Sequence, residues 1–313
     1  MKGLRIVCLF LLLAVPCVSQ TRTVPRKPIP VTGTRASLIP PVGFTPSDRF
    51  PGFSQQSTNA SIMVSEISGS FTETSSGLTD PAGLSKRGMV LLGNQKVSVV
   101  GYTGILVQVR QSMSGTEYLK WLFAIGDEQD TLFVVAVFPK ALERKLSEKL
   151  KASILSVRWD KKKTIEPTEG LNFSIAETGD LRIAGRMANT LVFSKNGVSP
   201  SKDIDDPIFV VGQSLAKADI ADHEGFAKAR VLKTAEVTDV EIESSKRITI
   251  DALNGYEIVA TAKDKASNKP MAIYQIILFE EDGYFIMGGL VSERNRQPSL
   301  KVFEEMARTF KRK

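Results

Sequence analysis

Residues 101–138 read GYTGILVQVRQSMSGTEYLKWLFAIGDEQDTLFVVAVF, and residues 255–291 read GYEIVATAKDKASNKPMAIYQIILFEEDGYFIMGGLV. Both stretches begin with Gly-Tyr, pass through two apolar runs, reverse at an acidic turn and end in a third apolar run. Alternating and continuous apolar runs bounded by turn residues are typical of antiparallel strands. The offset between the stretches is 154 residues at the Gly-Tyr pair and 152 at Asp130 and Asp282. A shared order at a near-constant offset of this length indicates a duplicated domain.

A helix is predicted after each stretch. In the first copy it begins near Ala141, and its apolar residues recur every three or four positions: Leu142, Leu146, Leu150, Ile154 and Val157. In the second copy it follows Pro298, with Ser299 as the expected N-cap. Its apolar stripe has the same spacing: Leu300, Phe303, Met306, Ala307 and Phe310. Each helix should therefore lie on one face of its sheet.

A β-rich stretch opens each copy, at Ser61–Ile67 in the first and at Thr190–Phe193 in the second. With these stretches matched, the second copy holds roughly 25 extra residues before its Gly-Tyr pair. The extra segment contains Ser199-Pro200, the run from Asp203 to Pro207, and His223-Glu224-Gly225. Inserted loops on a duplicated scaffold are where function tends to diverge, so a specific site is expected there.

This order of strands with a helix before the central strands and another at the end resembles the Mog1/PsbP-like superfamily. The resemblance rests on Gly101-Tyr102, on Gly255-Tyr256 and on the closing helices from Leu142 and Leu300. It covers both halves, from about Pro41 to Trp159 and from about Gly170 to Phe310. It implies an α+β fold of two tandem α/β/α sandwich domains, each a mainly antiparallel sheet flanked by helices. It also implies a binding or accessory role rather than catalysis, as an analogy of fold.

Composition divides the chain into five parts. Residues 20–40 are basic and rich in proline, which disfavours regular structure and predicts an extended linker. Residues 161–168 change from amphipathic to charged and end near Pro167, which predicts a domain boundary. The predicted parts are a signal peptide at 1–19, the linker at 20–40, domain 1 at 41–160, a second linker at 161–168 and domain 2 at 169–313.

The first twenty residues predict export. Lys2 and Arg5 precede an apolar run from Ile6 to Val15, and Cys17-Val18-Ser19 offers small residues for cleavage. A lipoprotein signal is the alternative, with Cys17 lipidated, but Pro16 fits such a site poorly. Cleavage after Ser19 would remove both cysteines of the chain, so no disulfide is expected in the mature protein. The apolar run is too short to span a membrane of about 30 Å hydrocarbon thickness.

The charge of the chain is mildly basic. Its formal net charge is +7, which falls to +5 when Lys2 and Arg5 leave with the signal. The remaining excess is clustered in Arg22, Arg26, Lys27 and Arg35 and in Lys161 to Lys163. These clusters are interpreted as solvated linkers. The alternative is that they bind an anionic surface such as lipid headgroups or a cell-wall polymer. They lack interleaved aromatic residues, so no nucleic-acid partner is predicted.

Catalytic and metal chemistry has few candidates. His223 is the chain's single histidine, and no Gly-x-Ser-x-Gly elbow accompanies it. Asp203, Asp205 and Asp206 are candidate calcium ligands, although the EF-hand spacing is absent and Pro207 favours a solvated loop. The acidic runs at Asp127 and at Glu280–Asp282 are interpreted as hairpin turns. No cofactor and no catalytic residue is predicted.

The sequence predicts a secreted or periplasmic non-catalytic binding protein. It would recognise a protein or an envelope component through a sheet face, a sheet edge or the cleft between the copies. One alternative is an extracytoplasmic hydrolase with its site in the domain 2 insertion. Another is a carrier of an apolar ligand, suggested by the apolar residues around Phe279, Phe285 and Met287.

Overall fold

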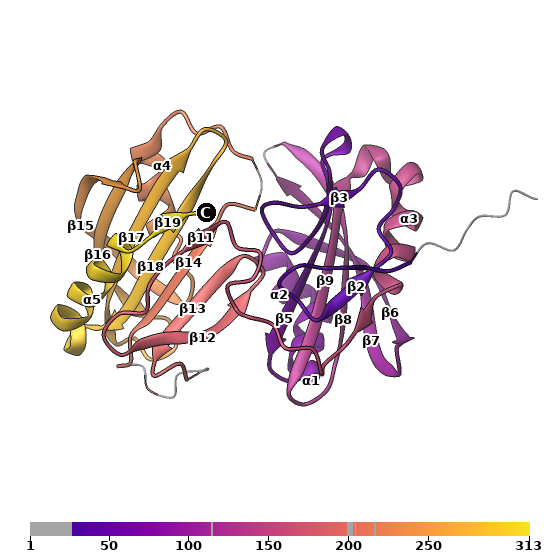
Figure 1. Ribbon diagram of the computed structural model, residues 1–313, viewed down its shortest axis with the longest axis horizontal. Helices are drawn as coiled ribbons and strands as arrows, with labels where there is room; N and C mark the ends of the chain where they lie inside the picture. Colours follow the sequence, from indigo (N-terminus) through magenta and orange to yellow (C-terminus); the bar gives the residue numbers. More distant parts are fainter. Residues whose placement is uncertain (1–26, 114, 199–202, 204, 216) are drawn as a thin grey trace, which may run out of the picture.

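The protein folds as two similar domains, each built on one antiparallel sheet, as Figure 1 shows. The structure is a computed structural model, and it describes residues 27–113, 115–198, 203, 205–215 and 217–313. Over these residues each large sheet has seven strands. The predicted signal peptide and the Ser199-Pro200 pair lie outside the described residues.

The first sheet has the strand order β3-β4-β5-β9-β8-β7-β6. Its strands are β3 (Thr45–Pro46), β4 (Gly52–Gln55), β5 (Ala60–Ser68), β6 (Met89–Val99), β7 (Tyr102–Met113), β8 (Thr116–Gly126) and β9 (Asp130–Pro139). Its helices are η1 (Gln56–Thr58), α1 (Phe71–Thr79), α2 (Pro81–Lys86), η2 (Lys140–Leu142) and α3 (Glu143–Leu155).

The second sheet has the strand order β12-β13-β14-β18-β17-β16-β15. Its strands are β12 (Leu181–Met187), β13 (Thr190–Lys195), β14 (Ile208–Gln213), β15 (Val237–Ile250), β16 (Leu253–Asp264), β17 (Pro270–Glu280) and β18 (Gly283–Ser292). Its helices are α4 (His223–Val231), η3 (Glu293–Asn295) and α5 (Arg296–Arg308).

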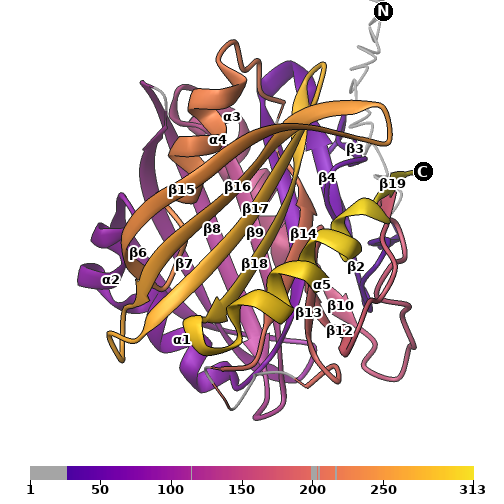
Figure 2. The same cartoon turned by 90° about the vertical axis from the view of Figure 1, so that its left-hand side faces the viewer.

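The two sheets have the same topology, strand for strand, which confirms the predicted α+β fold with two similar domains. Each sheet is covered on both faces. In the first domain α1 and α2 contribute to one apolar cluster and α3 to the other. In the second domain α4 covers one face and α5 the other, and Figure 2 shows α5 running across the strands. The predicted acidic turns are also confirmed, because Gly126 pairs with Thr131 and Glu280 pairs with Gly283 across them.

The Gly-Tyr pairs that suggested the repeat are not equivalent. Gly101 lies in the turn between β6 and β7, whereas Gly255 lies inside β16. In register Gly255 is opposite Leu278 of β17, and the corresponding position opposite Ile125 of β8 is Gly104. A Cβ at Gly104 or Gly255 would overlap the neighbouring strand, so both positions need glycine. The duplication is real, but the offset at this strand is three residues shorter than the sequence comparison indicated.

The β-rich stretches that open the copies were also matched wrongly. Ser61–Ile67 belongs to β5, whose counterpart in strand order is β14, whereas Thr190–Phe193 belongs to β13, the counterpart of β4. His223 therefore begins a helix that takes the place of α1 and α2, and it is part of the shared scaffold. The second copy is longer chiefly between β13 and β14, where residues 196–207 stand in the place of residues 56–59.

Part of the segment expected as a linker is folded. Within residues 27–40, strands β1 (Ile29–Pro30) and β2 (Ala36–Leu38) form a small sheet with β10 (Arg158–Trp159). Leu38 is fully buried in the core of the first domain, and Val31 and Ala36 are nearly so. The second domain repeats this arrangement, since β11 (Phe173–Ser174) pairs with β19 (Lys311–Arg312). In both domains, therefore, a short strand that precedes the sheet pairs with a short strand that follows the last helix of that domain.

The closing helix α5 begins earlier than expected. Its N-cap is Asn295 and not Ser299, so Pro298 lies in the first turn, where backbone N–H groups have no helical partner. This helix lies close against Gly289 of β18. A side chain there would overlap the ring of Phe303. No helix among the described residues has the length and apolar character needed to cross a membrane.

Candidate functional site

A pocket of about 480 Å³ lies where the two domains meet. Its walls come chiefly from strand β5, the segment that joins the domains and the end of β12, with residues 33–35, Pro51 and Asp130 completing the lining. The lining residues that carry charge are Arg35, Glu66, Asp130, Lys161, Lys162, Lys163 and Arg186. Cations outnumber anions among them, so the electrostatics of the pocket depend on which cations are neutralised.

One wall is an unpaired strand edge. Strand β4 pairs with β5 only along Ala60–Met63, whereas β9 pairs with it as far as Ser68. The backbone N–H of Val64 donates outward to Pro51, and the N–H of Gly69 donates inward to Gln129 beside β9. Because successive residues of a strand direct their backbone groups to opposite sides, Glu66 and Ser68 direct theirs outward. No strand of the described residues pairs with β5 there, and both residues line the pocket.

The facing wall is the outer strand of the second sheet. Strand β12 is at the edge of that sheet and lies against β5. Arg186, near its end, and Ala188, just after it, line the pocket. The pocket is therefore bounded by strand edges from both domains.

Arg186 is held at this boundary by backbone oxygens. Its Nε donates to Ala188 O at 2.6 Å, and its Nη1 donates to Pro167 O at 3.2 Å and to Glu169 O. Its buried Nη2 has no hydrogen-bond partner among the described residues. Burial lowers the pKa of Arg186 to about 10, and the Glu169 carboxylate opposes this without forming an ion pair with it. An arginine stays charged at neutral pH, so the pocket wall carries a positive charge that is incompletely compensated.

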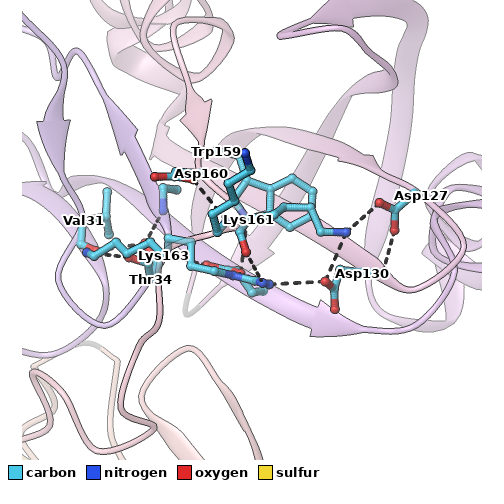
Figure 3. A network of polar contacts seen from close by, with 12 residues as sticks. Val31, Thr34, Asp127, Asp130, Trp159, Asp160, Lys161 and Lys163 are labelled. Atoms are coloured by element: carbon cyan, nitrogen blue, oxygen red, sulfur yellow. Dashed lines mark hydrogen bonds and ion pairs between the residues drawn. The ribbon is translucent and has the colours of Figure 1, made fainter.

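Two other cations of the pocket are neutralised. Glu66 accepts from the backbone N–H and from the guanidinium of Arg35, each at 2.5 Å. The same carboxylate accepts from Trp159 Nε1 at 3.2 Å. Lys161 reaches Asp127 at 2.6 Å and Asp130 at 3.2 Å, as Figure 3 shows. Both cations also lie over the ring of Trp159, which fixes their side chains against the wall.

The carboxylate of Asp127 is strongly stabilised in its charged form. The hydrogen bond from Lys161, together with the backbone N–H groups of Asp130 and Gln129, lowers its pKa from 3.8 to about 2. The same contact raises the pKa of Lys161. The turn thus holds the start of the interdomain segment against the first domain.

Replacing Asp127 with asparagine is expected to lower the free energy of unfolding of the first domain at neutral pH. The stability of the variant should also fall less than that of wild type as the pH is lowered. A lowered carboxyl pKa contributes stability that is complete above about pH 3.8 and is lost as the pH falls toward 2. Urea unfolding, followed by tryptophan fluorescence at several pH values, should show a difference between Asp127→Asn and wild type that disappears near pH 2. Glu128→Gln in the same turn is the control, and an equal effect of that change would contradict the assignment to Asp127.

Lys162 and Lys163 supply the accessible charge of the pocket. Both are exposed, and neither forms an ion pair with a described residue. Lys163 Nζ is near the backbone oxygen of Thr34, at 3.4 Å. With Arg35 and Lys161 neutralised by Glu66, Asp127 and Asp130, the net positive potential comes from Lys162, Lys163 and Arg186. Such a potential attracts anionic groups.

Contacts between the domains fix the two walls relative to each other. Arg49 of the first domain pairs with Asp282 in the β17–β18 turn and donates to Ser214 Oγ at 3.2 Å. Asn189 of the second domain donates to the backbone oxygens of Arg49 and Gln213, each at 2.7 Å. Gly33 N donates to the Glu169 side chain at 3.3 Å. Of these residues Gly33 lines the pocket, and the contacts together fix the two domains that form its walls.

The residues that the sequence singled out for chemistry lie elsewhere. His223 begins α4, and its ring stacks on Phe279 with the centroids 3.9 Å apart. It lines a separate pocket with Arg247, Thr249, Asn254 and Tyr256, and none of the three candidate aspartates lines that pocket.

Asp203, Asp205 and Asp206 stand in the loop between β13 and β14. Asp205 pairs with Arg294 at 3.5 Å, and its backbone oxygen accepts from Asn295 at 2.9 Å. Asp206 pairs with Lys195 at 3.4 Å. Over the described part of the chain no three His, Cys, Asp or Glu side chains gather as a metal site. The pairs instead fasten the loop to β13 and to η3.

Sequence reasoning did not find Arg186 or the role of Glu66. Arg186 stands among ordinary polar residues, and its burial results from contact with the interdomain segment. Lys161 to Lys163 were noticed as a charge cluster, but the sequence did not separate the paired Lys161 from its two neighbours. A signal was present at Arg35, because Ala36 and Leu38 alternate with polar residues as a short strand would.

Comparison with known proteins gives little further information. The chain matches no protein-family model, and no curated protein matches it. A protein of unknown function from Pseudomonas aeruginosa is similar over 44% of this chain and 95% of its own, with 14% identity and a TM-score of 0.31.

Two further structures are similar over most of the chain. The immunity protein TplEi of T6SS from Pseudomonas aeruginosa, solved with an "L" peptide, covers 90% of this chain and 97% of its own, with 10% identity and a TM-score of 0.29. A chain of the Tle4–Tli4 complex covers 90% and 96%, with 11% identity and a TM-score of 0.29. Because these TM-scores are all below 0.5, the likenesses support no inference about the partner of this chain.

Proposed function

We propose that this protein is a non-catalytic binding protein that recognises a partner protein in the pocket between its two domains. The single observation that carries the proposal is the pocket itself. It joins an unpaired strand edge to a cluster of cations that lack carboxylate partners, and contacts between the domains fix its walls relative to each other. Preformed concave sites with a few convergent polar groups are the usual places for binding.

The arrangement of polar groups supports binding rather than catalysis. A hydrolase in the second domain would need His223 and an aspartate or serine brought together, but His223 stacks on Phe279, and Asp205 and Asp206 secure a loop. The interdomain pocket holds lysines and arginines with carboxylates that are already engaged. Such groups attract and orient an anionic partner but offer no free base.

The carrier alternative has less support from the packing. Phe285 and Met287 are fully buried in one apolar cluster of the second domain, and Phe279 belongs to the cluster on the opposite face. These residues fill the two cores and do not line one shared cavity. Their apolar character is accounted for by ordinary packing.

Export remains part of the proposal. Residues 1–19 have the pattern of a signal peptide, so we propose that the partner is met in the periplasm or outside the cell. The Mog1/PsbP-like resemblance is proposed in the same sense, as a shared arrangement of sheet and helices. The domain limits at 41–160 and 169–313 are also proposed, with residues 29–38 added to the first domain by their pairing with β10.

Site-specific photocrosslinking tests the proposal. A photoreactive residue at Thr164, which lines the pocket, should capture a protein in the exporting cell that the same residue at the distant, exposed Thr238 of β15 does not capture. The captured protein, once purified, should bind the full chain. The double change Lys162→Glu and Lys163→Glu should weaken that binding by about tenfold or more.

The matched control reverses the charge of two exposed lysines on α3, Lys145 and Lys149. It alters net charge by the same amount and should leave binding unchanged. Equal loss of binding in both double variants would show a general charge effect, and capture at Thr238 alone would place the partner on another surface. Either result would contradict recognition in the pocket.

A further inference from the structure

We infer that the segment of the partner that enters the pocket is an extended, acidic stretch of chain that adds a strand to β5. This inference rests on the proposed function, because it concerns the ligand of the same pocket. The chemistry is that of β-strand addition, in which backbone hydrogen bonds supply affinity and neighbouring side chains supply selectivity.

The edge of β5 is the first step of the argument. Beyond Val64, whose outward N–H donates to Pro51, the outward backbone groups of β5 are those of Glu66 and Ser68, and no strand of the described residues is paired with them. The inward groups are paired with β9 as far as Ser68. An unpaired run of N–H and C=O groups on an ordered strand is a template for another strand. The length of the open edge suits a short segment of about three to five residues, because a strand rises by about 3.3 Å per residue.

The repeated fold shows that this open edge is specific to the first domain. The strand that corresponds to β5 is β14, and its six residues are paired with β13 over five positions, from Ile208 to Gly212. In the first domain β4 has only four residues and covers less than half of β5. Since the scaffold is otherwise the same strand for strand, the short β4 is a departure from the common pattern and not a requirement of the fold.

The unpaired backbone groups of β5 favour an extended chain over a helix. The opposite wall of the pocket is formed by Arg186 and Ala188, at the end of strand β12, which itself contacts β5. A helix, about 10 Å across with its side chains, has its interior backbone groups bonded internally and would leave the edge of β5 unpaired.

The charge of the pocket selects the side chains of that segment. Lys162 and Lys163 are exposed and form no ion pair with described residues, and the guanidinium of Arg186 lies in the wall with a buried nitrogen that lacks a partner. Arg35 and Lys161 are already occupied by Glu66, Asp127 and Asp130. The unbalanced charge is thus positive, and carboxylate side chains on the incoming strand would complement it.

A synthetic probe separates this inference from the proposed function. The probe is a nine-residue peptide of alternating threonine and glutamate with blocked ends and a fluorescent label, and its binding to the full chain is followed by fluorescence anisotropy at low salt. We expect saturable binding that weakens as salt is added. Two matched peptides, one with lysine in place of glutamate and one with alternate backbone nitrogens methylated, should bind about tenfold more weakly or not at all.

Amide hydrogen exchange of the complex locates the peptide. Binding should slow exchange at Glu66 and Ser68, whose N–H groups point into the pocket, with much less change at Ser65 and Ile67, whose groups face β9. Lys162→Glu with Lys163→Glu should weaken binding about tenfold, and Lys145→Glu with Lys149→Glu should leave it unchanged.

Each contrary result has a separate meaning. Equal binding of the methylated peptide would overturn strand addition, and equal binding of the lysine peptide would overturn selection by charge. No binding of any probe would overturn the inference as a whole. Specific photocapture from Thr164 together with no probe binding would leave the proposed function standing with a different kind of ligand, whereas loss of both would remove both.

Discussion

Replacing Phe303 with alanine is expected to lower the free energy of unfolding of the second domain by about 3–5 kcal/mol and to leave the first domain nearly unchanged. Phe303 projects from α5 and is fully buried. Its ring stacks on Phe209 with the centroids 5.3 Å apart, lies 6.2 Å from the ring of Tyr274, and covers Gly289. Because Gly289 has no side chain to move into the space, the cavity would stay open, and the cost should lie toward the upper end of the range.

The two tryptophans make this prediction domain-specific. Trp121 and Trp159 both lie in the core of the first domain, and the chain has no other tryptophan. Urea unfolding of Phe303→Ala followed by tryptophan fluorescence should therefore match wild type, while far-ultraviolet circular dichroism should show an earlier transition for part of the signal. The mirror variant Leu150→Ala removes a fully buried side chain of α3 and should shift the fluorescence transition instead.

Coincident shifts of both signals in either variant would mean that the two domains unfold as one unit. The contacts of Arg49 with Asp282 and Ser214 couple the domains, but they are few and polar compared with the two separate cores. Interfaces of this kind between domains of one chain usually leave each domain able to unfold by itself.

Much of the fold was predictable because it depends on local patterns. The alternation along Ile105–Val109 and the stripe through Leu146 and Leu150 report strand and helix directly, since those periods follow from backbone geometry. The errors arose where two similar patterns could be aligned in more than one way. Strands β13 and β14 are both short apolar runs in the sequence. Only the order of the hydrogen-bonded strands in the sheet shows which of them corresponds to β5.

The pocket was not predictable for a different reason. Its open edge exists because β4 stops after four residues, and no local pattern in β5 reports the length of its neighbour. Its electrostatics depend on pairs between residues far apart in the chain, such as Arg35 with Glu66 and Lys161 with Asp127. Each of these side chains taken alone has the sequence context of an ordinary solvated charge.

Replacing Glu66 with alanine is expected to lower the stability of the first domain by about 2–3 kcal/mol and to disturb one wall of the pocket. This carboxylate accepts from the backbone and the guanidinium of Arg35 and from the indole N–H of Trp159. Its removal leaves those donors without an acceptor in a partly buried place, where the cost exceeds that of a surface ion pair but is below the about 3–5 kcal/mol of a fully buried one.

The indole of Trp159 provides the measurement. In a Trp121→Phe background, Glu66→Ala should change the emission of Trp159 and lower the urea midpoint that it reports, because the ring loses a hydrogen bond and the fixed position of Arg35 above it. Glu66→Gln keeps one acceptor and should retain part of the stability. Asp251→Ala, which removes a comparable pair with Arg312 in the second domain, should leave the Trp159 signal unchanged. A midpoint for Glu66→Ala equal to that of wild type would mean that Arg35 and Trp159 find solvent or other partners, and that this wall does not depend on the carboxylate.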